Sequence, residues 1–525
     1  MLPKPGFALS GQVLYDTKIA QVKTYGTSGP RYNHLVNEFN EEFAKINGQG
    51  VTAAVVDAGA VLQTHSEFRR SASGMSQITL LTKKPPDDHS TFVAGIIGAK
   101  GQNERAKGLA PGVALLSLDW DDDLRKLRTV APRIQISNHS YAPQGGWHFL
   151  NPTSGWAWFG DEKLNSEEDA KFGKYGPREA EFDNVLHGFP KLLAFVAAGN
   201  NRTDGPTEKQ PFKHQVFSGQ DSNERVLTKF SSNLIHKLND WDRGGLDTLT
   251  GLCLSKNDIC VGAIDNIMQS RPITIESYSG WGPADDGRIK PDLVASGENV
   301  FSASGNNSYT TMSGTAMATA VGSGIAALLI QLYRDTRGGF KRMPTAAEIK
   351  AVLIHTATDA GVRGPDPIYG WGSINTQLAG QVIAHKDTAG KFVHLISTGQ
   401  LNAGVTKKAS LIATGSRFKV TLVWTDPAGK INTGRLDDAL PTLQNDLDIR
   451  LISPEGKVYY PYSLDPQRPL SPALNDGPNR VDNVEVINIT TSQPGQEWKL
   501  ELKARKLNVG LSQSFALVVS GLKAP

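Results

Sequence analysis

Cysteine is scarce in this chain of 525 residues, which contains only Cys253 and Cys260. Two cysteines exclude a disulfide-rich scaffold and any zinc module built on clustered cysteines. Cys260 opens an apolar run of the kind that forms buried strands. We therefore expect two buried thiols, and a bridge across a hairpin is the alternative.

The chain also lacks an excess of either charge. It has 55 Lys and Arg against 52 Asp and Glu, which gives a formal net charge of +3. Proteins that bind nucleic acid by neutralising phosphates usually carry a basic excess or a basic tract. We therefore expect no nucleic-acid partner. Nothing in the composition predicts an oligomeric state.

Long hydrophobic runs are missing as well. The longest, at 192–198 and 325–330, are much shorter than a membrane span. We therefore expect no membrane partner. Residues 1–12 contain no hydrophobic core of a signal peptide. These absences predict a cytoplasmic protein, unless a targeting segment is missing from this sequence.

From residue 50 to about residue 385, apolar runs typical of buried strands alternate with stretches that suit helices. The strand candidates are 51–59, 113–120, 133–141, 191–200 and 259–265. Such alternation indicates βαβ units and a parallel sheet. We predict an α/β domain at 50–388, with a mostly parallel sheet and helices on both faces. Residues 1–49 are predicted to be an N-terminal extension that packs on this core.

The sequence pattern changes after 385–391, which looks like a linker. In the segments that follow, polar and apolar residues alternate with a period of two, turn signals separate the segments, and no long helical pattern is present. This pattern predicts an all-β domain at 389–525, as a sandwich or jelly roll.

Four short segments place a polar or small residue where a strand ends or a helix begins. Asp57 lies in Asp-Ala-Gly, His89 opens HSTFVAG, Asn200 ends AAGN, and Ala316 lies in SGTAMA. These motifs, in this order, resemble those of the subtilisin-like serine peptidases, the subtilases. The resemblance spans about residues 50–385. The segments LVWTDPAG and LQNDLDIRLISPEG resemble the β-domain of a large bacterial branch of that family.

The resemblance implies a Ser-His-Asp serine endopeptidase that acts on peptides or proteins and needs no organic cofactor. Asp57 would orient His89, His89 would act as base and then acid, and Asn200 would donate to the oxyanion. Most relatives are secreted, so the resemblance implies a secreted or extracytoplasmic protein.

One departure from the family pattern is decisive, because the nucleophilic serine is replaced by Ala316. In subtilisin, loss of this serine lowers kcat by about 10⁶-fold. We favour an inactive Ser→Ala form of a peptidase, since Asp57, His89 and Asn200 are all retained. A natural pseudopeptidase that binds peptides is the alternative, and a peptide ligase or macrocyclase on the same scaffold is a further one.

Two further segments match the family's substrate-binding residues. Ser140, Tyr141 and Ala142 align with the strand that pairs with the substrate backbone. Together with a second segment they would flank the pocket for the side chain that precedes the cleaved bond. The members of this second segment are Ala197, Ala198 and Gly199.

Calcium is a possible cofactor, because many relatives bind it. Acidic residues of the β-domain offer oxygen ligands at alternating spacing, although solvated acidic turns look the same. The candidates are Asp437, Asp438, Asp446, Asp448 and Asp482. A separate acidic run follows the strand at 113–120, and we hypothesise that it favours basic substrate residues. Its members are Asp119, Asp121, Asp122 and Asp123.

Overall fold

The protein is described here by a computed structural model. The described residues are 7–9, 25–26, 28–69, 75–151, 155–160, 168–206, 215–218, 226–229, 239, 244–266, 272–337, 342–384, 395–432 and 435–523. The predicted linker at 385–391 lies outside them.

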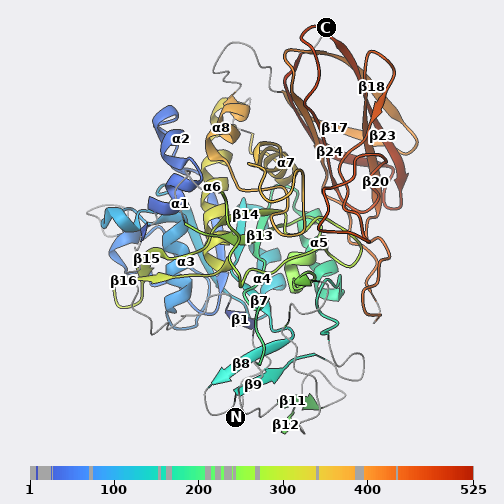
Figure 1. The fold of residues 1–525 in the computed structure, drawn as a ribbon. Helices are drawn as coiled ribbons and strands as arrows, with labels where there is room; N and C mark the ends of the chain where they lie inside the picture. The colour runs from blue at the N-terminus through green and yellow to red at the C-terminus, as the bar shows by residue number, and fades with distance from the viewer. Residues whose placement is uncertain are drawn as a thin grey trace.

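A seven-stranded sheet forms the centre of the N-terminal part (Figure 1). Its strand order is β14-β13-β10-β6-β3-β5-β4. All its neighbouring strands run parallel. The predicted parallel sheet is therefore confirmed. Its strands are β3 (Thr52–Asp57), β4 (Ile78–Leu80), β5 (Ala114–Asp119), β6 (Ile136–His139), β10 (Leu193–Ala197), β13 (Ile259–Ile264) and β14 (Leu293–Ser296).

Helices cover both faces of this sheet, as predicted. Successive side chains of a strand point to opposite faces. Accordingly Ala53 and Val55 join one hydrophobic cluster, and Ala54 and Val56 join the other. The first cluster contains residues of α2 (Val36–Glu42), α3 (Asp88–Gly98), α6 (Thr315–Thr336), α7 (Ala346–Thr356) and α8 (Thr376–Ala384). The second contains residues of α4 (Asp123–Val130) and α5 (Pro177–Gly188).

Helix α6 is the long helix at the centre of the first face. By length and composition it could cross a membrane, but its apolar window is 100% buried inside the protein. It contacts β6, β10, β13 and β14. Its first turn lies near the carboxyl end of β10, because the Thr315 backbone N–H donates to Asn200, which follows that strand. The remaining elements of this part are α1 (Ser28–Asn33), β1 (Phe7–Leu9), β2 (Tyr25–Gly26), β7 (Tyr141–Pro143), β8 (Trp147–Asn151), β9 (Gly155–Trp158), β11 (Gln215–Ser218), β12 (Val226–Lys229), β15 (Val300–Ser304) and β16 (Ser308–Met312).

The C-terminal part consists of two antiparallel sheets, with the orders β17-β24-β19-β22 and β21-β20-β23-β18-β25. Both sheets contribute to one hydrophobic cluster, with Val420 and Leu422 from one sheet and Ile449 and Leu500 from the other. The predicted all-β region is therefore confirmed. Its strands are β17 (Leu395–Asn402), β18 (Thr406–Ala413), β19 (Phe418–Val423), β20 (Asn445–Ile452), β21 (Val458–Tyr459), β22 (Val484–Ile489), β23 (Glu497–Leu507), β24 (Ser512–Ser520) and β25 (Leu522–Lys523).

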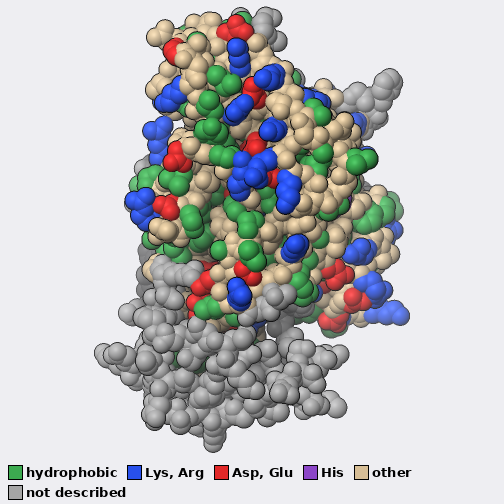
Figure 2. Space-filling view, turned by 90° about the vertical axis from the view of Figure 1, so that its right-hand side faces the viewer, with side chains coloured by type: hydrophobic (Ala, Val, Ile, Leu, Met, Phe, Trp, Pro, Cys, Tyr) green, Lys and Arg blue, Asp and Glu red, His purple; other side chains and the backbone are tan. Residues whose placement is uncertain are grey.

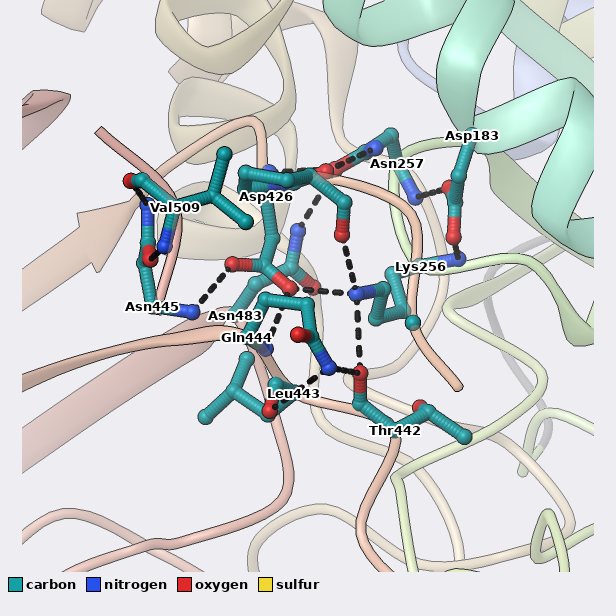
Figure 3. A network of polar contacts seen from close by, with 12 residues as sticks. Asp183, Lys256, Asn257, Asp426, Thr442, Leu443, Gln444, Asn445, Asn483 and Val509 are labelled. Atoms are coloured by element: carbon teal, nitrogen blue, oxygen red, sulfur yellow. Dashed lines mark hydrogen bonds and ion pairs between the residues drawn. The ribbon is translucent and has the colours of Figure 1, made fainter. Parts of the chain in front are cut away.

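A buried polar network joins the two parts (Figure 3). The ammonium group of Lys256 is fully buried and pairs with the Asp426 carboxylate. It also donates to the carbonyl oxygens of Pro427 at 2.6 Å and Thr442 at 3.1 Å. The neighbouring Asn257 donates to the Asp426 carbonyl at 2.8 Å. The network gives the buried ammonium group of Lys256 several hydrogen-bond acceptors, which is what a buried charge requires.

The expectation of two free thiols is wrong, because Cys253 and Cys260 form a disulfide. Cys253 lies in a short 3₁₀ helix (Gly251–Leu254), from which the chain turns straight back into β13. The turn brings the two Cα atoms to 4.8 Å, which is within the range that a disulfide spans. The sequence could not settle this, because the bridge depends on how the intervening loop folds.

Candidate active site

Asp57 and His89 form a buried pair at the carboxyl edge of the sheet. Asp57 is the last residue of β3, and His89 is the second residue of α3. Nδ1 of His89 lies 2.9 Å from Oδ1 and 3.1 Å from Oδ2 of Asp57. Because a carboxylate accepts, Nδ1 carries the proton, and Nε2 is the atom that remains able to take one.

The electrostatics of the pair favour a charged histidine. Burial alone lowers the pKa of His89, but the carboxylates of Asp57 and Asp87 outweigh it and raise that pKa above the ordinary value. Asp87 also caps α3, the helix that carries His89, because its side chain accepts from the Ser90 backbone N–H at 2.9 Å. The stabilised imidazolium is the state that a general base reaches after it has taken a proton.

The other ring nitrogen of His89 faces no hydrogen-bonding group. Nε2 is buried and has no partner in the part of the chain that the structure describes. A buried polar atom without a partner is unfavourable in a resting protein. Such an atom marks a place where a hydroxyl group or a substrate would be expected.

Ala316 lies in the first turn of α6 and is fully buried. The backbone N–H groups of a first turn have no partner within the helix, and the helix dipole gives that end a partial positive charge. Gly314, the residue before the helix, has a φ of 151° and carries no side chain. The geometry therefore offers a backbone donor at residue 316, whatever side chain that residue carries.

Asn200 is held against the same helix end. Its Oδ1 accepts from the backbone N–H of Thr315 at 2.9 Å and from the Thr315 hydroxyl at 2.8 Å. Thr315 Oγ1 in turn accepts from the Gly199 backbone N–H at 3.1 Å. With Oδ1 engaged, the amide group of Asn200 has Nδ2 as its remaining donor.

Ser140 connects the predicted substrate strand to Ala316. Its hydroxyl donates to the Ala316 carbonyl at 3.0 Å. The side chain of Tyr141 does not face a substrate as expected, because it is buried and its hydroxyl donates to the Asp123 carboxylate at 2.5 Å. The backbone of Tyr141 forms part of β7, as does that of Ala142.

A second extended segment lies along β7. Strand β1 pairs with it in antiparallel fashion, with Ala8 opposite Ala142 and Leu9 opposite Tyr141. These two strands form a separate two-stranded sheet. The backbone of β7 is therefore shaped to accept an extended chain by strand addition.

Space is present beside the second predicted segment. Ala197 and Ala198 are buried, and Gly199 has φ of 95°, where side chains other than hydrogen are disfavoured. A Cβ atom added at Gly199 would meet nothing within 4 Å. An opening of this kind, next to Thr315 and Ala316, suits the side chain of a bound peptide.

The hypothesis of an acidic cleft loses its basis, because each carboxylate of that run is paired with a cation. Asp119 binds Lys126, Asp121 binds Lys84, Asp122 binds Arg125, and Asp123 binds Arg178. Asp123 also accepts from Tyr141. The run is therefore paired with two cations of the adjoining helix α4, Arg125 and Lys126, and with two from other elements, Lys84 and Arg178.

Four of the five candidate calcium ligands are already engaged elsewhere. Asp446 and Asp448 pair with Arg480, Asp482 accepts from the Ile289 backbone at 3.0 Å, and Asp438 accepts from its own turn. The structure does not bring the five together.

The fifth candidate, Asp437, lies in a different group of carboxylates. It offers one oxygen within 4.8 Å of oxygens from Glu168 and Asp247. A Cβ atom at Gly173 would collide with the carboxylates of Asp247 and Asp285, so these oxygens point into a space that only a glycine leaves open. The chemistry of this donor set fits a hard cation such as Ca²⁺.

Two residues of the site were not anticipated. Thr315 bonds both Asn200 and Gly199, and Asp87 supports His89. Asp87 had a visible signal, since an acidic residue before a helical run is typical of a cap. Thr315 had none, because its partners lie 115 and 116 residues away.

The model of the subtilase family (Peptidase_S8) matches residues 48–372, which is more than half of the chain. The chain belongs to the subtilase family. Serine protease AprX from Bacillus subtilis (strain 168) is 25% identical over 365 residues, covering 63% of this chain and 66% of AprX. An extracellular serine protease from Serratia marcescens is 26% identical over 363 residues, covering 63% of this chain and 32% of that protein. The match thus spans less than two thirds of the length of either relative.

Two solved structures are similar to this chain over most of their own length. The self-cleaved protease domain of PatA is 19% identical, with a TM-score of 0.42, and the match covers 65% of this chain and 100% of that domain. MycP1 with its N-terminal propeptide removed is 21% identical, with a TM-score of 0.39, and the match covers 67% of this chain and 96% of MycP1. The match to the subtilase family and the observed parallel sheet confirm the predicted subtilisin-like α/β fold.

Proposed function

We propose that this subtilase is the inactive Ser→Ala form of a serine endopeptidase. The observation that carries the proposal is the Asp57–His89 pair, with its carboxylate on one ring nitrogen and a buried second nitrogen turned away from it. The start of α6 supports the proposal, because it offers the backbone N–H of residue 316, and Asn200, which is bonded to Thr315, offers a second donor of the kind that acyl transfer requires. A serine in place of Ala316 would complete a Ser-His-Asp triad in the family's chain order.

The mechanism follows from the roles of these groups. In the Ala316→Ser form, the serine oxygen attacks the carbonyl carbon of the peptide while Nε2 of His89 accepts the hydroxyl proton. The Asp57 carboxylate stabilises the imidazolium. Nδ2 of Asn200 and the backbone N–H of residue 316 bind the oxyanion. His89 then gives its proton to the leaving amine, the C–N bond breaks, and water hydrolyses the acyl-enzyme by the same steps.

A peptide or protein is the substrate that suits this site. Strand β1 lies on β7 next to the residues that hold Ala316. Main-chain hydrogen bonds of this type hold an extended chain of any sequence, and side-chain pockets then select among sequences. The open space beside Gly199 supports such a pocket.

Ala316 also supports a second candidate function. A natural pseudopeptidase would keep the cleft for binding peptides without cleaving them, and Asp57, His89 and Asn200 would then have no catalytic purpose. A ligase or macrocyclase on this scaffold would transfer the acyl group to an amine instead of water.

The Ala316→Ser variant tests the proposal. Cleavage of a denatured protein or a chromogenic peptide should rise by several orders of magnitude, up to about 10⁶-fold. A serine-directed phosphonylating reagent should label the new serine alone. Adding His89→Ala should abolish both effects, and mass spectrometry of the products separates hydrolysis from transpeptidation. A folded Ala316→Ser protein that neither cleaves nor takes the label would establish the pseudopeptidase instead.

We further propose that this chain functions outside the cytoplasm. The bond between Cys253 and Cys260 supports this location, since disulfides persist in oxidising compartments. The relative from Serratia marcescens is named an extracellular protease. Calcium stays a proposal as well, with Glu168, Asp247 and Asp437 as the residues that would hold it. Its contribution would be to the stability of the loops around it.

A further inference from the structure

A hollow of about 360 Å³ opens on the outer face of the five-stranded sheet, across β18, β23 and β20. Figure 2 faces the side of the molecule on which this sheet lies and shows many Lys and Arg side chains on its upper half. Five cationic side chains line the hollow: Lys408, Arg450, Arg480, Lys503 and Arg505.

The strand register explains why so many cations share one face. Lys408 of β18 lies opposite Glu501 of β23, and Glu501 lies opposite Arg450 of β20. Lys503, two residues further along β23, lies on the same face because side chains alternate along a strand. Neighbouring strands are about 4.8 Å apart, so the three strands set the cations at regular intervals.

Carboxylates lie beneath these cations and hold them in place. Glu501 is only 7% exposed, whereas its partners Lys408 and Arg450 are 70% and 48% exposed. Asp448 is likewise covered, at 18% exposed, and pairs with Arg480. The face therefore presents positive groups to solvent and keeps the negative groups below.

This arrangement pre-organises the cations for a ligand. An arginine has five N–H donors in a fixed plane, and Arg450 uses its Nε for Glu501. A side chain that is already ordered by an ion pair, such as Arg450, loses less entropy when it binds a ligand. Lys503 differs from these paired cations, because among the described residues no carboxylate lies within ion-pair distance of it.

We propose that this hollow of the β-domain binds an acidic polysaccharide. The proposal does not depend on peptidase activity, because the hollow belongs to the C-terminal sheets alone.

The lining distinguishes a polysaccharide from other anionic polymers. Sugar hydroxyls both donate and accept, so they can bond the hydroxyl groups of Thr406 and Tyr460 in the lining, while the sugar's acidic groups pair with the cations. Tyr460 also adds an aromatic ring to the wall. Polyphosphate has no hydroxyls along its chain and could use only the cations. An extended peptide cannot add to β23, because β23 already has a partner strand on each side.

Binding of fluorescein-labelled heparin fragments to the full chain, with Ala316 unchanged, tests the proposal. We expect binding that weakens with rising salt, because counterions are released from the polymer. The Lys408→Gln/Arg450→Gln/Lys503→Gln variant should bind at least about tenfold more weakly, since each cation contributes one charge contact. The matched control removes three exposed cations of the peptidase part, Lys45, Arg133 and Lys191, and should leave the affinity unchanged.

A second variant distinguishes a site whose cations are held in fixed positions from general electrostatic attraction to a positive surface. Glu501→Gln makes the face more positive, so attraction alone predicts tighter heparin binding, whereas loss of the anchor for Lys408 and Arg450 predicts weaker binding. We expect weaker binding, with circular dichroism and melting confirming that each variant is folded. Equal losses in the control variant, tighter binding by Glu501→Gln, or equally tight binding of polyphosphate or single-stranded DNA would each overturn the proposal. Absence of heparin binding by the unsubstituted chain would overturn it too.

Discussion

The carboxylate of Asp426, in the C-terminal β-domain, accepts a hydrogen bond from the fully buried ammonium group of Lys256, in the peptidase part. The contact joins residues 170 positions apart in the sequence. Asp183 extends it into the peptidase part, because its carboxylate accepts from the backbone N–H groups of Lys256 and Asn257 at 3.1 Å each. The two parts of the chain therefore share one set of buried charges and should unfold together.

Removal of Lys256 should be strongly destabilising. Lys256→Met leaves the Asp426 carboxylate buried without its cation, and breaking a buried pair from one side costs about 3–5 kcal/mol. Urea unfolding followed by circular dichroism measures the loss. Lys84→Met is the matched control, because the Lys84–Asp121 pair is exposed at 31% and 66% and such pairs contribute about 1 kcal/mol or less. A loss no larger than in this control would contradict the buried-pair interpretation.

The acid limb of the pH profile should be displaced upward in the Ala316→Ser form. Catalysis needs neutral His89, and the carboxylates around it raise its pKa above the ordinary value of about 6.5. Activity is therefore lost as the pH falls through this raised pKa. The pH dependence of kcat/KM measures it, and Asp87→Asn should move the limb toward lower pH. A limb that lies below pH 6.5, or does not move in Asp87→Asn, would contradict the assignment.

Thr315 should act as a positioning residue for Asn200 and Gly199. In the Ala316→Ser background, Thr315→Val removes the hydroxyl that bonds both, and kcat should fall more than KM rises, by about tenfold or more in kcat. Thr315→Ser keeps the hydroxyl and should restore most of the rate. If Thr315→Val and Thr315→Ser lower kcat equally, the hydroxyl does not position the oxyanion donor.

The Cys253–Cys260 bond should stabilise the turn before β13. Replacement of both cysteines by alanine should lower the free energy of unfolding by about 2.5 kcal/mol, as expected for so short a closed loop. Iodoacetamide under denaturing conditions checks the bond itself. The chain should take up no label without reductant and two labels after reduction. Two labels without reductant would show that the thiols are free.

Calcium should raise the melting temperature if Glu168, Asp247 and Asp437 hold the ion. A single site stabilises the folded state by about 2.7 kcal/mol when calcium is present at 100 times its Kd, and EDTA should reverse the effect. Asp437→Asn should abolish the shift. Asp438→Asn is the matched control, because Asp438 caps its own turn and does not belong to the carboxylate group. Equal shifts in all three proteins would place the ion elsewhere.

Much of the fold was predictable from local patterns. The runs that became β3, β5, β10 and β13 are mostly apolar because both faces of a parallel sheet are covered, whereas β6 is buried although three of its four residues are polar. The β-domain was predictable from the alternation of polar and apolar residues. Each of these two patterns is contained in about ten residues, so it can be recognised without knowing which distant segments are in contact.

The rest depended on contacts between distant segments. The acidic run at Asp119–Asp123 looked like a charged surface, but its cations Lys84 and Arg178 come from other elements. The pairing of β1 with β7 links residues more than 130 positions apart and has no local signature. The disulfide was missed for a related reason, since the path of a loop decides whether two thiols meet.

The position of β1 has a kinetic consequence. Because β1 is tethered to the strand it covers, its effective concentration there is on the order of millimolar and does not fall when the protein is diluted. Under the proposed function, in which β7 receives the substrate, an incoming peptide would compete with β1, so the measured affinity of a micromolar substrate would be weaker than its own contacts allow. An inhibitor on a separate molecule dissociates when the protein is diluted, whereas β1 stays bound to β7 because it is part of the same chain.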